Sequence, residues 1–153
     1  VCSSDLRIYR AFVAPRAEQR TFFHGHTYTG NPIACAAALA NLDRMAEPGF
    51  FTGIQATAAT MTEHLERLSS LPVVYETRQV GLMAGIELRH VDGSPLPPES
   101  FTGSVVCERA RDHGVILRPL GDVIVWMPPL SSTAADLALL AHATRQAIEE
   151  TLP

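Results

Sequence analysis

The sequence predicts an α/β protein built as a two-layer unit with a mostly antiparallel sheet. Residues 51–69 and 133–151 place apolar side chains at helical spacing, which is typical of helices with one buried face. Residues 81–88 alternate instead, so that every second side chain from Leu82 to Leu88 is apolar, as in a strand. The predicted order is helix, helix, strand, strand, helix, strand, strand, helix, and the first helix precedes the two-layer unit.

The first part of the chain is predicted to contain a short helical piece at 6–13 and an alanine-rich helix at 33–45. Asn31 offers an N-capping side chain and Pro32 takes the first helical position, while a Pro-Gly pair at 48–49 ends the helix. The small side chains of this helix allow close approach, which suits packing against a sheet or another subunit.

The middle of the chain is predicted to continue with a helix and two strands. The helix at 51–69 is expected to bury one face, made by Ile54, Ala58, Met61, Leu65 and Leu68. The strands are expected at 73–77 and 81–88. Three prolines and a glycine at 91–100 predict a surface loop.

The last part is predicted to contain two helices and two strands. A helix at 101–113 is expected to stop at Gly114, because glycine suits the turn after a helix. Short strands are predicted at 115–118 and 123–126, with a hinge between them. The final helix begins near Thr133, which forms a capping-box-like pair with Asp136, and its buried stripe is expected to contain Leu137, Leu140, Ala141, Thr144 and Ile148.

Composition argues against several classes of function. The 153 residues carry a formal charge of −4 and no basic block, so nucleic acid is not an expected partner. No stretch reaches the roughly 18 apolar residues of a membrane span, so a membrane is not expected either. Three cysteines without a C-x-x-C pair predict buried free thiols in a cytoplasmic protein. All twelve Lys-or-Arg positions are arginine, so no reaction can use a lysine amine of this chain.

The segment HGHTYTG at residues 24–30 is the first candidate site. Two histidines without a nearby third ligand make a metal site the weaker interpretation. Glycines that let backbone amides approach a ligand, threonine hydroxyls and the start of a helix at Asn31 favour phosphate binding. A plain capped turn is the alternative. The residues concerned are Gly25, Thr27, Thr29 and Gly30.

Arg118 is the second candidate, because it is a lone arginine between an apolar strand and a proline. Its guanidinium could bind a carboxylate with two hydrogen bonds in a dry pocket. A structural role, in which it caps the sheet or pairs with Asp122, is the alternative. The remaining histidines receive no role, and pairs four residues apart on helices, such as Glu63 with Arg67 and Arg145 with Glu149, are interpreted as solvated ion pairs.

Two stretches together resemble one enzyme family. FFHGHTYTGNPIACAAALANL and HGVILRPLGDVIVWMPPL are similar to segments of the class III aminotransferases, which have the fold-type-I architecture and use pyridoxal 5′-phosphate. The resemblance covers roughly residues 7–152. The form HGHTYTGNP looks most like the branch that acts in biotin synthesis, while acetylornithine, ornithine or 4-aminobutyrate aminotransferases are alternatives. A non-catalytic binding or dimerising module is the alternative from a different class.

The resemblance implies roles at matching positions. Thr27 and Tyr28 correspond to cofactor-binding residues, and the Thr27 hydroxyl would hold the cofactor phosphate across a homodimer interface with shared active sites. Arg118 corresponds to the arginine that holds the carboxylate of the keto acid substrate, and Gly25 to a backbone contact with the same group. Residues 1–49 would end the large cofactor-binding domain, and 50–153 would form the small C-terminal domain.

One departure from the family is large. The lysine that forms the Schiff base with the cofactor lies shortly upstream of the HGHTYTGNP loop in the family, and this chain has no lysine. No catalytic residue of the family is therefore expected in this chain. We expect a C-terminal fragment that is inactive alone. Residues 1–6 do not resemble the family, so a non-native start stays open.

Overall fold

The computed structural model describes residues 6–20, 22, 25, 27 and 29–152. The chain forms two compact units, Val1–Arg44 and Met45–Pro153, which are described one at a time. Within the described residues, no helix is long and apolar enough to cross a membrane.

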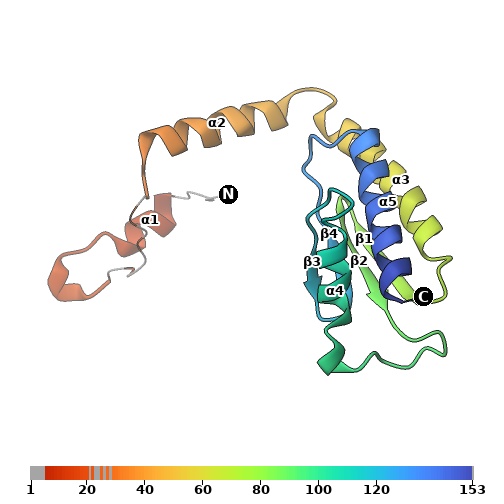
Figure 1. Cartoon of the computed structure of the whole chain (residues 1–153). Coiled ribbons are helices and arrows are strands. Elements are labelled where there is room, and N and C mark those ends of the chain that lie inside the picture. The colour runs from red at the N-terminus through yellow and green to blue at the C-terminus, as the bar shows by residue number, and fades with distance from the viewer. Residues whose placement is uncertain (1–5, 21, 23–24, 26, 28, 153) are drawn as a thin grey trace. The chain divides into compact units, whose positions relative to one another are not determined.

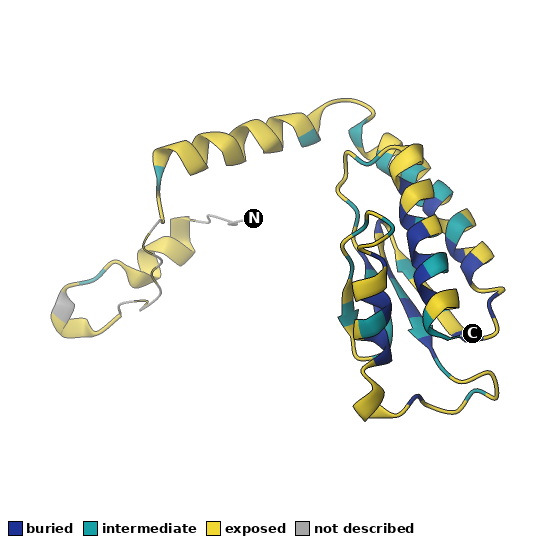
Figure 2. Cartoon of the chain, in the orientation of Figure 1, coloured by how far each residue is buried: buried dark blue, intermediate teal, exposed yellow. Residues whose placement is uncertain are grey.

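The described residues of the first unit form helices and no hydrophobic core. Its elements are α1 (Leu6–Phe12), the 3-10 turn η1 (Arg16–Glu18) and α2 (Pro32–Ala46) (Figure 1). The Oδ1 atom of Asn31 accepts the backbone N–H groups of Ile33 at 3.0 Å and Ala34 at 3.1 Å, which confirms the predicted cap. No residue of α1 or α2 is buried (Figure 2). Cys35 on α2 is therefore exposed, and its predicted burial is wrong.

The second unit is the predicted two-layer unit. Its elements are α3 (Phe50–Leu68), β1 (Val74–Val80), β2 (Met83–Leu88), η2 (Pro98–Ser100), α4 (Thr102–Arg109), β3 (Arg118–Leu120), β4 (Val123–Trp126) and α5 (Ala134–Thr151). The strands form one sheet in the order β1-β2-β4-β3, and each pair is antiparallel. Helices α3, α4 and α5 cover one face of the sheet (Figure 1).

The register of the strands separates a covered face from an open face. Ala84 lies opposite Trp126, and Ile86 lies opposite Ile124. All four are buried, which confirms the alternation predicted for 81–88. Met83 and Val125 alternate with them and point to the other face. The open face of the sheet therefore has its own apolar side chains.

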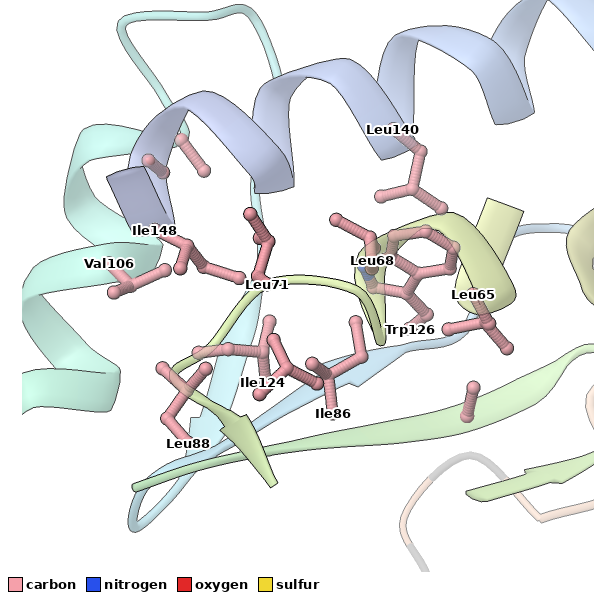
Figure 3. Close-up of a cluster of buried hydrophobic side chains, with 14 of the residues drawn as sticks. Leu65, Leu68, Leu71, Ile86, Leu88, Val106, Ile124, Trp126, Leu140 and Ile148 are labelled. Atoms are coloured by element: carbon pink, nitrogen blue, oxygen red, sulfur yellow. The ribbon is translucent and has the colours of Figure 1, made fainter. Parts of the chain in front are cut away.

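The core lies between the helices and the covered face (Figure 3). Leu65 and Leu68 of α3 pack near Trp126, as the predicted helix face requires. The indole Nε1–H of Trp126 donates to the hydroxyl of Thr144 at 3.0 Å, and that hydroxyl donates to the carbonyl of Leu140 at 2.7 Å. Among the described residues, no buried side-chain polar atom lacks a partner. A buried polar pair therefore fixes α5 on the sheet.

The predicted bounds of three strands are wrong. The strand expected at 81–88 begins only at Met83, after the turn that follows Val80. The strand expected at 115–118 is Arg118–Leu120, because Pro119 lies in an edge strand where its missing N–H costs no ladder hydrogen bond. The strand expected to end at Thr77 runs on to Val80, since the backbone pairs with β2 up to the tight turn.

The helix expected at 101–113 ends early, at Arg109, and continues as turns to Gly114. The N–H of Gly114 donates to Arg111 at 2.9 Å, and the N–H of Val115 donates to Ala110 at 3.0 Å. This pair of bonds is a Schellman motif, and Gly114 has the left-handed φ of 83° that the motif requires. The predicted role of Gly114 is confirmed at the end of the turns.

The start of α5 agrees with the prediction. The Thr133 hydroxyl accepts the N–H of Asp136 at 3.2 Å, and the Asp136 carboxylate accepts the N–H of Thr133 at 2.8 Å. The two residues therefore form a complete capping box. The predicted stripe of α5 is buried except for Ala141, which is partly buried against the core.

Candidate functional site

Arg118 is exposed on the open face of the sheet, in the edge strand β3. It pairs with Val125 of β4, Val125 pairs with Gly85 of β2, and Gly85 pairs with Arg78 of β1. One row across the sheet therefore carries an arginine at each end. Residues that pair across strands point to the same face.

The two arginines of this row differ in their partners. Arg78 donates to Glu76 at 2.6 Å and to Glu87 at 2.9 Å, so its charge is matched within the sheet. Within the described part of the chain, the Arg118 side chain makes no ion pair or hydrogen bond. The Oδ1 atom of Asp122 accepts the N–H of Gly103 at 3.2 Å instead. The alternative pairing of Arg118 with Asp122 is therefore wrong, and the guanidinium is available to a ligand.

A hollow of about 560 Å³ lies beside Arg118. Its lining is mostly apolar and includes Met83, Ile116, Leu120, Val125, Met127 and Pro128. The polar side chains in the lining are Arg118, Ser132 and Asp136, and the Asp136 carboxylate is engaged by the N–H and hydroxyl of Thr133. An apolar hollow with one available guanidinium suits a ligand that joins an aliphatic chain to a carboxylate.

The apolar lining was not predicted as part of a site, although the sequence contains a signal for part of it. The alternation that buries Ala84 and Ile86 must turn Met83 to the open face. Met83 and Leu120 are 52% and 58% exposed and line the same hollow, so they offer apolar surface to a ligand there. Which apolar side chains of the open face line one hollow depends on the order of the strands, and this order could not be predicted from the sequence.

The loop before α2 is described only in part. Gly25 is described and Thr27 is exposed in the turn, whereas Tyr28 and both histidines of HGHTYTG lie outside the described residues. The amides of Ile33 and Ala34 at the start of α2 are bound by Asn31, and Pro32 has no N–H. The predicted phosphate site therefore cannot use these helix amides. The Thr27 hydroxyl remains as the described candidate donor for a phosphate.

These residues fit only one end of pyridoxal 5′-phosphate. Thr27 could donate a hydrogen bond to its phosphate. No lysine occurs in the sequence, so the amine that carries this cofactor in aminotransferases is not among these residues.

Other reactive groups of the described chain do not form a second catalytic centre. Burial raises the pKa of the Cys107 thiol to about 11, so it stays protonated and is a poor nucleophile. The His113 ring contacts the Glu150 carboxylate at 3.0 Å and links the turns after α4 to α5. Among the described residues, no group of three potential ligands could hold a metal ion.

Comparison with known proteins identifies the family. Residues 5–148 match the model of the class-III aminotransferases. The chain is 47% identical over 143 residues to the adenosylmethionine-8-amino-7-oxononanoate aminotransferase of Nitratidesulfovibrio vulgaris, covering 92% of this chain and 26% of that protein. The chain thus spans between a quarter and a third of the length of the relatives it matches.

Solved structures agree with this match. The crystal structure of adenosylmethionine-8-amino-7-oxononanoate aminotransferase from Methanocaldococcus jannaschii superposes with a TM-score of 0.81 at 36% identity, over 94% of this chain and 33% of that one. An aminotransferase from Vibrio fluvialis in a PMP-bound form gives 0.77 at 25% identity, over 91% of this chain and 33% of that one. The predicted α/β fold of a pyridoxal-phosphate-dependent transferase, with its antiparallel sheet, is confirmed by these neighbours and by the strand order. The chain belongs to the class III aminotransferases.

Proposed function

We propose that this chain forms the C-terminal part of a pyridoxal-phosphate-dependent aminotransferase of biotin synthesis, which converts 8-amino-7-oxononanoate to 7,8-diaminononanoate. The similarity to aminotransferases named for this substrate supports the reaction. The geometry around Arg118 supports the substrate independently.

The available guanidinium of Arg118 beside an apolar hollow is the observation that carries the proposal. The keto acid has a carboxylate at one end, a run of methylene groups, and the ketone near the other end. Arg118 binds the carboxylate, and Met83 and Leu120 cover the methylene groups. Binding at these two places fixes the distance of the ketone from Arg118, so the reacting end is oriented without contacts to the ketone itself.

The cofactor, when bound, supplies the electron sink for amino-group transfer. The Thr27 hydroxyl holds its phosphate, Tyr28 is a second cofactor-binding residue, and Gly25 offers a backbone contact to the substrate carboxylate. These assignments rest on the family resemblance. They include a homodimer in which Thr27 serves the active site of the opposite subunit.

The sequence contains no lysine, so the proposal assigns the lysine that carries the cofactor to a part of the enzyme outside these 153 residues. We use "intact enzyme" for this chain together with that part. The intact enzyme should aminate 8-amino-7-oxononanoate when given pyridoxal 5′-phosphate and an amino donor, and mass spectrometry of the product tests this. Turnover of 4-aminobutyrate or acetylornithine without amination of 8-amino-7-oxononanoate would replace the proposal with another activity of the same family.

A further inference from the structure

A second hollow lies on the helical layer, between α3 and α5. Its volume is about 230 Å³. The floor is formed by the buried Leu68 of α3 and by Ala138 and Ala141 of α5. Two alanines one helical turn apart leave room between the helices, and the longer side chains stand around that space. This hollow shares no lining residue with the hollow beside Arg118.

Nitrogen-bearing side chains form the whole polar rim of this hollow. His64 and Arg67 come from α3, and His142 and Arg145 come from α5. Each pair is three residues apart, so both members lie on one helix face. No carboxylate lines the hollow. A rim of this kind attracts an anion rather than a cation.

The donors of these side chains are largely unused. The Arg67 Nη2 atom is 3.7 Å from Glu63, which is too long for a hydrogen bond. Arg145 contacts Glu149 at 2.8 Å through Nε, and its two terminal nitrogens make no hydrogen bond within the described chain. Glu63 and Glu149 pair with the two arginines but do not line the hollow. Both guanidinium groups can therefore donate to a third group.

His142 contacts a residue that does not line the hollow. Its ring lies edge-to-face against the ring of His113, with 6.3 Å between centroids, and His113 contacts Glu150 at 3.0 Å. The Glu150 carboxylate also lies 3.8 Å from Arg109. The Glu150 carboxylate therefore pairs with His113 and Arg109 and does not line the hollow.

We propose that the hollow between α3 and α5 binds a small phosphate-bearing anion, of the size of a diphosphate group. Phosphate oxygens accept several charge-assisted hydrogen bonds at once, and arginines from two helices offer such donors from opposite sides. The site is separate from the substrate site of the proposed reaction, because Arg118 lies on the open face of the sheet.

Calorimetric titration of the full chain with inorganic diphosphate tests the proposal, at constant ionic strength set with sodium chloride. Wild-type protein should show saturable binding. Arg67→Gln and Arg145→Gln should each weaken it about tenfold, since each removes charge-assisted hydrogen bonds to phosphate. Arg20→Gln is the matched control, because Arg20 is an exposed arginine that pairs with Glu18 and does not line the hollow. This control should bind diphosphate as the wild type does.

Circular dichroism checks the folding of the variants, which should match that of the wild type because both arginines are on the surface. Titration with ADP distinguishes two kinds of ligand, a free diphosphate and the diphosphate group of a nucleotide. Equal affinities for ADP and diphosphate indicate that the phosphates alone are recognised, and tighter binding of ADP indicates a nucleotide. Absence of saturable binding by the wild type, or equal binding by all three variants, overturns the proposal.

Discussion

The buried hydroxyl of Thr144 accepts a hydrogen bond from the indole N–H of Trp126. Thr144→Val keeps the size of the side chain and leaves this N–H unpaired in the core. The free energy of unfolding should fall by about 1–3 kcal/mol, the usual cost of an unsatisfied buried donor. Urea denaturation measures this change. Thr144→Ser keeps the acceptor, so its free energy of unfolding should fall less. A fall as large as that of the valine variant would show that the hydrogen bond is not the cause.

Gly103 shows how closely two backbones approach. A Cβ atom at this position would overlap the carbonyl oxygen of Gly121, in the turn between β3 and β4. Gly103→Ala must therefore push α4 away from that turn, and it should destabilise the protein by about 1–3 kcal/mol. Thermal denaturation tests this prediction.

Gly53 provides the matched control within helix α3. No atom lies within 4 Å of the Cβ position at this residue. Gly53→Ala should therefore stabilise the protein by about 0.5–1 kcal/mol, because alanine loses less backbone entropy in a helix. An equal effect of the two alanine substitutions would contradict the close approach at Gly103.

The hairpin of β1 and β2 is fixed by charged side chains on the open face. Glu87 accepts hydrogen bonds from Arg78 at 2.9 Å and from Arg89 at 2.8 Å. Arg89 also lies over the Tyr75 ring, 3.7 Å from its centroid. These bonds lower the pKa of Glu87, with the Arg78 hydrogen bond as the larger cause and the Arg89 hydrogen bond next.

A depressed carboxylate pKa gives the hairpin a defined pH dependence. The stabilisation is complete above the ordinary Glu value of 4.5 and is lost as the pH falls through the lower value of the folded state. Wild-type protein should therefore be more stable than Glu87→Gln at pH 7, and the difference should shrink below about pH 4.5. Denaturation curves across this range measure the difference, and a gap that stays constant with pH contradicts the pairing.

The helix starts that are fixed by neighbouring capping residues are the boundaries that the sequence predicts best. The start of α2 follows from Asn31 and Pro32, and the start of α5 follows from Thr133 and Asp136, since a cap involves only neighbouring residues. The position of β3 depends on Pro119 being in an edge strand. The edge position depends on the order of all four strands, so the bounds predicted for this strand from the sequence were wrong.

The same distinction holds for the candidate site. Arg118 could be identified because a lone arginine in an apolar segment is unusual. Met83 and Leu120 could not be assigned to it, because they reach the hollow through the order of the strands. The helix amides expected to bind phosphate are occupied, because the Asn31 side chain competes for them.

The whole chain carries the hollow beside Arg118 that we propose for the substrate, and its sequence contains no lysine. The 153-residue chain mixed with pyridoxal 5′-phosphate, amino donor and keto acid should form no aminated product above the rate without protein. The physical reason is that no side-chain amine is available to carry the cofactor. A coupled product assay, with the intact enzyme as the positive control, measures this. Product formed by the chain alone would contradict the assignment of catalysis to residues outside it.

The central claim is that Arg118 of the intact enzyme binds the substrate carboxylate. The most direct measurement compares wild type with Arg118→Gln on 8-amino-7-oxononanoate and on its neutral carboxamide analogue. For the wild type, kcat/KM should fall on the order of tenfold to a hundredfold when the carboxylate becomes an amide. For Arg118→Gln the same change of substrate should cost little, because the interacting charge is already gone. Equal losses for both enzymes would show that Arg118 and the carboxylate do not interact.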